Sequence, residues 1–236
     1  MKYIVLPEHG FRRLSFYLAM EEYVARHFNE SDLFFMWNVE PSVIFGRNQV
    51  LEAEVNVDYC RKHGINMYRR KSGGGCVYAD QDNLMLSYIS AEENVNLAFN
   101  NFINMITLVL RKMNIEAVST SHNDIMIGDK KVSGTACYHL PGKCVVHSTL
   151  LYDTNMDNML NAITHNAQKL QQKGIQSVRQ RITLLKEYTS MSFEELQTHI
   201  RSTLCRDELL LTHDDIIAIE ELERSYLKEE FINLIP

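Results

Sequence analysis

The chain has 236 residues, 45% of them hydrophobic, and a formal net charge of -6, which are typical of one globular domain with a sizeable core. An acidic chain whose one dense basic cluster lies at residues 69–71 is a poor match to proteins that bind nucleic acid, because these neutralise many phosphates with lysine and arginine. No stretch approaches the ~20 apolar residues of a membrane span, and the N-terminus does not resemble a signal peptide. The five cysteines include no CxxC pair, so we expect reduced thiols in a cytoplasmic protein.

The N-terminal half predicts two long helices with short strands between them. Apolar residues recur at helical spacing over residues 11–28, which predicts an amphipathic helix that packs on a sheet. Apolar runs predict strands at residues 33–37, 42–45, 65–69, 76–78 and 84–89. The periodicity of residues 94–113 predicts the second long helix.

The C-terminal half predicts more strands and then helices. Residues 117–151 alternate short apolar runs with a turn at Gly128-Asp129 and a loop at 140–143. Helical patterns follow at 157–170, 192–204 and 213–231, and Ser192 has the character of a helix cap with acids in the first turn. Runs of strands interrupted by isolated helices predict an α+β fold, with a mixed, largely antiparallel sheet flanked by helices.

The segment Arg69-Arg70-Lys71-Ser72-Gly73-Gly74-Gly75 is the most unusual in the chain. Three adjacent glycines allow the backbone to approach a ligand closely, and their amides can converge on an anion. Cationic side chains upstream would add charge-assisted hydrogen bonds to a phosphate or carboxylate. The pattern matches neither a Walker A loop nor a GxGxxG fingerprint. A hairpin turn with a solvated basic flank is the alternative interpretation.

A second segment pairs polar groups with a lysine. Asn123 and Asp124 open an apolar run, and Lys130 and Lys131 follow the turn, before the small residues 133–136. A lysine held beside small residues could stabilise charge that develops on a phosphoryl or acyl oxygen. Two lysines beside a turn are also a common solvated pair that protects a sheet edge.

Together and in this order, these segments resemble the lipoate–protein ligase family of the biotinyl/lipoyl ligase superfamily. The similarity runs from about residue 33 to residue 183, and its motifs are Trp37, PSVIFGRNQ at 41–49, EVN at 54–56, RRKSGGGCVY at 69–78, Asp82-Asn83, Asn123-Asp124, KVSGTA at 131–136, HSTLL at 147–151 and KGIQSVRQR at 173–181. Two positions depart from the family pattern, since Ser148 replaces a glycine after the histidine and Ala79-Asp80 replaces a common His-Asp pair.

The resemblance implies a ligase that uses ATP and Mg²⁺ to convert lipoate to lipoyl-AMP and then passes the lipoyl group to a lysine of a carrier domain. It implies that Lys131 is catalytic and contacts both the α-phosphate and the acyl carbonyl, and that Asp124 lies near the Mg²⁺. The residues expected to bind ATP and lipoyl-AMP are Arg70, Gly73, Gly74, Gly75, Cys76, Val77, Tyr78, Asn123, Asp124, Lys131, Ser133, Gly134 and Thr135.

The acyl chain needs an apolar slot, for which Val43, Phe45, Leu84 and His147 are candidates, with Val77 and Tyr78 beside them. The alternative is that the aliphatic and aromatic residues among them are simple core positions. His147 is the one polar candidate, and a lone histidine in a strand-like run is more often structural.

For the whole chain we expect a single catalytic domain over residues 1–236, with a small helical tail at 190–236 and without the C-terminal accessory domain of many bacterial ligases. Either a separate polypeptide supplies that domain or the chain works without it. The implied acceptors are apo lipoyl domains of 2-oxoacid dehydrogenase complexes or the glycine cleavage H protein. Neither nucleic acid nor a membrane is an expected partner.

Three other functions remain open. An octanoyltransferase of the same fold would form a thioester, which needs a cysteine nucleophile. No cysteine lies at 116–127 or 145–204, where two transferase types carry theirs, so Cys144 is the thiol to test and Cys76 and Cys137 are better explained as apolar fillers. A non-catalytic protein that binds lipoate or lipoyl-AMP is the second alternative. Biotin ligase is the weakest, because its glycine segment differs.

Overall fold

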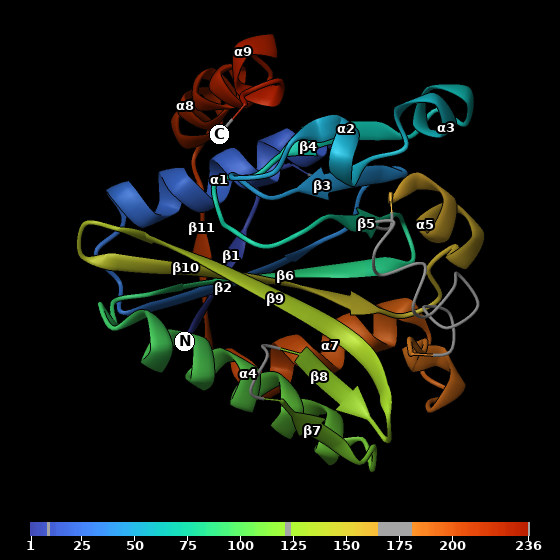
Figure 1. Cartoon of the computed structure of the whole chain (residues 1–236). Coiled ribbons are helices and arrows are strands. Elements are labelled where there is room, and N and C mark those ends of the chain that lie inside the picture. The colour runs from blue at the N-terminus through green and yellow to red at the C-terminus, as the bar shows by residue number, and fades with distance from the viewer. Residues whose placement is uncertain (9, 121–123, 165–180, 236) are drawn as a thin grey trace.

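The computed structural model describes residues 1–8, 10–120, 124–164 and 181–235. Its elements are runs of strands interrupted by helices, as the sequence predicts (Figure 1). In chain order they are β1 (Lys2–Val5), α1 (Leu14–His27), β2 (Asp32–Trp37), β3 (Ser42–Phe45), α2 (Leu51–Glu54), α3 (Val57–Lys62), β4 (Asn66–Arg69), β5 (Val77–Ala79), β6 (Asn83–Ser90), α4 (Val95–Lys112), β7 (Ala117–Ser119), β8 (Asp124–Ile127), β9 (Lys130–Leu140), β10 (Lys143–Leu151), α5 (Met156–Ala162), η1 (Leu185–Glu187), α7 (Phe193–Leu204), β11 (Asp207–Leu210), α8 (His213–Tyr226) and α9 (Glu229–Ile232).

The main sheet has the strand order β11-β1-β2-β6-β10-β9-β8-β7. Its centre is antiparallel, whereas β1 runs parallel to both β2 and β11. The central strands β6 and β10 are buried along their whole length because helices cover both faces of the sheet. This mixed, largely antiparallel sheet between helices confirms the predicted α+β class.

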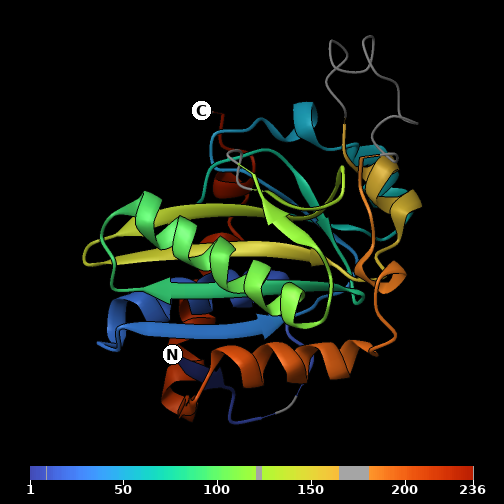
Figure 2. The same cartoon turned by 90° about the horizontal axis from the view of Figure 1, so that it is seen from below.

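Helices lie on both faces of the main sheet (Figure 2), and an apolar core lies between the sheet and the helices on each face. On one face α4 and α7 pack on the sheet, and Asn94 caps α4 by accepting from the amides of Asn96 and Leu97. Ser192 caps α7 within a capping box, as its sequence predicts. On the other face α1 lies between the sheet and α8, so that α1 is buried on both sides.

A smaller sheet of order β4-β3-β5 lies beside the main one. It packs with α3 and α5 around a third apolar cluster that contains Val43 and Phe45. Because β3 lies between β4 and β5, the glycine segment at 70–76 crosses from one side of β3 to the other. This crossing excludes the hairpin-turn interpretation, in which β4 and β5 would be direct neighbours.

The structure differs from the predicted elements at both chain ends. Strands β1 and β11 were not predicted, and they pair with each other across almost the whole sequence, so that the region 190–236 contributes an edge strand to the main sheet. The pattern predicted as one helix at 213–231 is broken between α8 and α9, where Lys228 is extended. Within the described residues, no helix combines the length and apolarity that a bilayer crossing requires.

Candidate active site

The glycine segment passes over the loop that follows β3 in close contact with it. Gly74 has φ +91, a conformation that favours glycine, and a Cβ on Gly46 would lie 2.0 Å from the Gly74 carbonyl oxygen. The amide of Arg47 donates to the carbonyl of Ser72 at 2.9 Å. Glycine at positions 46 and 74 therefore allows two backbone segments to meet without side chains between them.

Of the three cations before the glycines, Arg69 and Arg70 are buried and Lys71 is partly buried, and each contacts a different part of the protein. Arg69 is fully buried and donates to the carbonyls of Arg47 and Gln49, and to those of Ile232 and Leu234 near the chain end. From the sequence we expected all three cations to bind a phosphate or carboxylate. Two of them instead hold neighbouring segments together, because Lys71 forms an ion pair with Glu22 at 2.5 Å.

The Arg70 guanidinium fixes the shape of the glycine segment. Its Nη2 donates to the carbonyls of Gly73 and Gly75 at 2.7 and 2.8 Å, and its Nη1 donates to the carbonyl of Ile44 at 2.9 Å. Burial lowers the pKa of Arg70 to about 10, so the group is still charged at neutral pH. Arg70 thus brings a positive charge to the inner side of the segment.

Lys131 lies on β9 beside Asp124 of β8, and its Nζ is 2.7 Å from the Asp124 carboxylate. A Cβ on Gly134 would lie 2.9 Å from this Nζ, so glycine leaves the lysine side chain room to cross the strand. The backbone of Lys131 is fixed from the other side, because its amide donates to the Arg181 carbonyl and its carbonyl accepts from the Thr183 amide. Lys131 is therefore held at both its backbone and its amine.

Lys131 and the glycine segment face each other across one cavity, the main cavity, of about 290 Å³. An adjoining cavity of about 230 Å³ shares five residues with it, and the two together have the size of a small-ligand site. The predicted site residues that line the main cavity are Arg70, Gly74, Gly75, Cys76, Val77, Asp124, Lys131, Gly134, Thr135 and His147. Tyr78 lines only the adjoining cavity.

The remaining predicted residues lie elsewhere. Gly73 lines a separate surface pocket with Gly74. Ser133 is a fully buried residue of β9 that does not line the main cavity, and Asn123 lies outside the described residues. The motif at 173–181 lies outside them too, apart from Arg181.

The acyl-pocket candidates Val43, Phe45 and Leu84 pack into the apolar cores rather than the cavity wall. Their strand neighbours Ile44 and Met85 line the main cavity instead. Successive side chains of a strand point to opposite faces, so these three candidates point away from the main cavity while their neighbours face it.

The apolar end of the main cavity is formed by residues that the sequence did not suggest as site residues. Leu18 of α1 and Trp37 of β2 line it together with Ile44 and Met85. Trp37 was noted as part of a strand motif, but periodicity cannot distinguish a cavity wall from a core position. The helical spacing of α1 likewise places Leu18 on a buried face without showing that this face borders a cavity.

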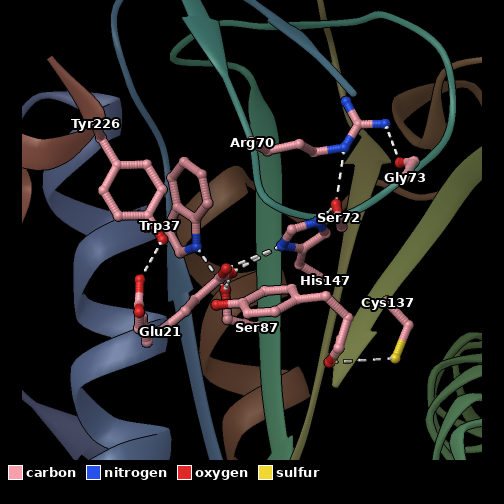
Figure 3. A network of polar contacts seen from close by, with 11 residues as sticks. Glu21, Trp37, Arg70, Ser72, Gly73, Ser87, Cys137, His147 and Tyr226 are labelled. Atoms are coloured by element: carbon pink, nitrogen blue, oxygen red, sulfur yellow. Dashed lines mark hydrogen bonds and ion pairs between the residues drawn. The ribbon is translucent and has the colours of Figure 1, made fainter. Parts of the chain in front are cut away.

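A chain of buried polar groups connects this apolar end to the glycine segment (Figure 3). His147 contacts the Glu21 carboxylate through Nδ1 at 2.9 Å and the Ser72 hydroxyl through Nε2 at 2.7 Å. Ser72 also accepts from Arg70 Nε at 2.9 Å, and Glu21 accepts from Ser87 at 2.6 Å. Glu21 was missed because a single acid in an amphipathic helix pattern has no motif of its own.

The cysteines do not have the environment of a nucleophile. Burial raises the pKa of Cys76, the only thiol among the described lining residues of the main cavity, to about 12. Cys144 is fully buried, does not line that cavity, and has a pKa that burial also raises. Since the thiolate is the reactive form, this arrangement disfavours a thioester route.

The same cavity contains little that could hold a resident metal. In the described ranges, no three His, Cys, Asp or Glu side chains gather as a metal site. Asp124 is the one carboxylate among the described residues that line the main cavity. A single carboxylate fits Mg²⁺ only where phosphate oxygens complete its coordination, because Mg²⁺ is usually bound by one or two carboxylates together with substrate phosphates.

The chain matches a known protein family over most of its length. Residues 14–205 match the family model of the lipoyl protein ligase A/B catalytic domain. Lipoate–protein ligase 1 from Staphylococcus aureus is 35% identical over 213 residues, which are 87% of this chain and 65% of that relative. The chain thus spans slightly less than two thirds of that relative's length.

Solved structures agree with this match. A bi-partite lipoate protein ligase from Thermoplasma acidophilum has a TM-score of 0.88 and 25% identity, with 100% of this chain and 98% of that chain covered. Lipoate–protein ligase A bound with ATP shares the fold, with a TM-score of 0.82, 23% identity and 100% and 99% of the two chains covered. With its glycine segment, its paired lysine and aspartate and the cavity between them, the chain belongs to the lipoyl protein ligase A/B catalytic domain family.

Proposed function

We propose that this chain is a lipoate–protein ligase, which activates lipoate with ATP and transfers the lipoyl group to a lysine of a carrier domain. The observation that carries the proposal is the composition of the main cavity. Its apolar end, at Leu18, Trp37, Ile44 and Met85, suits an aliphatic acyl chain, and Lys131 lies at its polar side. The names of the relatives support lipoate as the acid and ATP as the activating nucleotide.

In the first step a lipoate carboxylate oxygen attacks the α-phosphorus of ATP, and pyrophosphate leaves with the electrons of the broken P–O bond. Negative charge accumulates on the α-phosphate oxygens during this displacement. Lys131, already held beside Asp124, supplies a positive charge there, and Arg70 with the amides of residues 75–78 holds the adenylate from the opposite wall. Preorganised charges of this kind need no rearrangement as the reaction proceeds.

In the second step the neutral amine of the acceptor lysine attacks the acyl carbonyl of lipoyl-AMP. An amide bond forms, AMP leaves with the electrons of the broken acyl–oxygen bond, and the attacking nitrogen releases its proton to water. The carbonyl oxygen becomes negative in the transition state, and the Lys131 ammonium stabilises it. One lysine therefore serves both steps because the same oxygen-rich centre lies beside it in each.

Mg²⁺ would be held by Asp124 together with phosphate oxygens of ATP, and Asn123 directly precedes Asp124 in the sequence. The ion would supply positive charge that neutralises the phosphates. Asp124 must share its carboxylate between Lys131 and the ion, which keeps both cations close to the reacting phosphate.

The acceptors that we propose are apo lipoyl domains of 2-oxoacid dehydrogenase complexes or the glycine cleavage H protein. A separate polypeptide is a proposed partner for the adenylation step. The archaeal neighbour supports it, because that ligase is bi-partite and this chain covers 98% of the chain compared. We place the reaction in the cytoplasm, since it consumes ATP and the five cysteines are free thiols.

The test is an intact-mass assay on an apo lipoyl domain with three acyl sources. Modification with lipoate and Mg-ATP would support a self-sufficient ligase, and modification only by synthetic lipoyl-AMP would support a chain that needs a partner for adenylation. Modification only by octanoyl carrier protein, abolished in Cys144→Ala, would refute the ligase in favour of a transferase. Lipoate binding without any product would refute it in favour of a binding protein.

A further inference from the structure

Glu21 is a fully buried carboxylate near the centre of α1, one helical turn from the cavity residue Leu18. It does not line the main cavity itself. A buried carboxylate is unfavourable unless several donors satisfy it, and here the ring of His147 and the hydroxyl of Ser87 do so at 2.9 and 2.6 Å. These contacts connect Glu21 to two different walls of the cavity.

The first connection runs to the glycine segment through His147 and Ser72. Arg70 Nε can only donate, so the Ser72 oxygen accepts from it and keeps its own hydrogen, which it can give to His147 Nε2. In that arrangement the ring carries its hydrogen on Nδ1. That hydrogen points to Glu21, which as a carboxylate only accepts.

The second connection runs to the acyl end. Trp37 Nε1 donates to the Ser87 hydroxyl at 2.8 Å, and Ser87 donates to Glu21. Both chains of donors therefore end on the same carboxylate (Figure 3). Because a carboxylate has several lone pairs and no hydrogen, it can terminate both chains at once. A side chain at position 21 that donated a hydrogen would reverse the direction of the hydrogen bonds in one of these two chains.

We propose that Glu21 is a positioning residue of this enzyme, which orients His147 and, through Ser72 and Arg70, holds the glycine segment in its ligand-binding shape. The role in turnover rests on the proposed function, whereas the role in the shape of the segment does not. Arg70 connects Ser72 to the backbone of the glycine segment, because it donates to the Ser72 hydroxyl and to the carbonyls of Gly73 and Gly75. Glu21 thus acts on the substrates without contact to them.

The direct test measures the glycine segment without any substrate. In Glu21→Ala, hydrogen exchange of the peptide spanning residues 70–76 should be faster on the order of tenfold, while peptides of α4 keep their wild-type rates. Glu223→Gln is the matched control, since Glu223 is another buried carboxylate beside α1, with Ser15 as its partner, and it should leave the segment unchanged. Wild-type exchange of the 70–76 peptide in Glu21→Ala would overturn the proposal.

A double-mutant cycle separates positioning from general packing. Ser72→Ala breaks the same chain at its other end, so we expect Glu21→Ala and Ser72→Ala each to lower kcat/KM on the order of 10²-fold, and the double variant to lose little more than either one. Losses that multiply would show that Glu21 acts through the fold in general and would overturn the proposal. Absence of lipoyl transfer by the wild type would refute the proposed function instead, and the exchange result would still stand.

The wild-type protein alone provides a final check, which holds even where Glu21→Ala does not fold. Nitrogen-15 NMR of the His147 ring should show the hydrogen on Nδ1 and an unprotonated Nε2. A ring with hydrogen on Nε2 and none on Nδ1 could not donate to Glu21 and would overturn the proposal. Glu21→Gln, which keeps the volume and one acceptor oxygen, should recover part of the exchange protection that Glu21→Ala loses.

Discussion

At the scale of single residues, the position of Lys131 depends on the absence of a side chain at Gly134. Gly134 has no Cβ, and one would lie 3.0 Å from the lysine Cε and 2.9 Å from its Nζ. The sequence suggested that small residues after the lysine leave room for a ligand. The structure shows that Gly134 first leaves room for the lysine, which then meets Asp124 across the strand pair.

We predict that Lys131→Ala lowers kcat by ~10²–10³-fold, because a preorganised charge at the reacting oxygens is lost. Single-turnover transfer from synthetic lipoyl-AMP to an apo lipoyl domain is the measurement, since it isolates the second step. Lys130→Ala is the control, because Lys130 is the adjacent lysine of β9 and does not line the main cavity. Near-normal transfer by Lys131→Ala would contradict the assigned role.

At the scale of elements, the loops that form the cavity are held by buried cations rather than by regular hydrogen-bonded structure. The Arg69 guanidinium stacks over the Phe45 ring, 4.7 Å from its centroid. It joins the loop after β3 to the end of α9 by donating to carbonyls of both. Since a loop buried without partners would leave its carbonyls unsatisfied, one arginine stabilises two segments that are distant in sequence.

We predict that Arg69→Met lowers the free energy of unfolding by at least ~2 kcal/mol, because each buried carbonyl left without a donor costs ~1–3 kcal/mol. Urea unfolding followed by circular dichroism measures the change. Arg61→Met in α3 is the control, since Arg61 is exposed, and it should change the stability by less than ~0.5 kcal/mol. Equal unfolding midpoints for the two variants would contradict the role of Arg69 in joining these two segments.

At the scale of the whole molecule, α1 joins the sheet, the glycine segment and α8. Glu22, next to Glu21, accepts from Lys71 at 2.5 Å, from Arg26 at 2.8 Å and from Tyr226 of α8 at 2.8 Å. Burial by itself raises the pKa of Glu22, but the hydrogen bonds from Lys71, Arg26 and Tyr226, with the charge of Lys71, outweigh it and bring the pKa below its usual value. The ionised carboxylate of Glu22 thus holds α1, the glycine segment and α8 together.

This shift predicts a pH dependence of stability. A carboxyl whose pKa is lower in the folded state stabilises the protein above its unfolded pKa of ~4.3, and this contribution is lost as pH falls through the folded value. Thermal unfolding should therefore show Glu22→Gln with a lower Tm than wild type at pH 7, and the difference should shrink toward zero below about pH 4. A difference in Tm that is constant from pH 7 to pH 3 would contradict this linkage.

Local patterns predicted most of the fold because they report on short-range physics. The apolar periodicities of α1 and α4 located both helices to within a few residues, and the Ser192 cap was confirmed with its capping box. The strands β1 and β11 were missed because each is four residues long and pairs only with segments far away in sequence. The sequence did not identify Ile44 and Met85 as lining residues of the main cavity, since local alternation does not say which face borders a cavity.

By itself the sequence determined the α+β class, the family and the two segments that face each other in the cavity. It could do so because helical periodicity, glycine-rich backbone and the order of motifs are properties of neighbouring residues. The tertiary structure alone decided that the basic cluster is largely internal, that Ile44 and Met85 line the cavity, and that Glu21 lies behind it. Burial and hydrogen-bond direction depend on groups that approach from distant parts of the chain, and no local pattern records them.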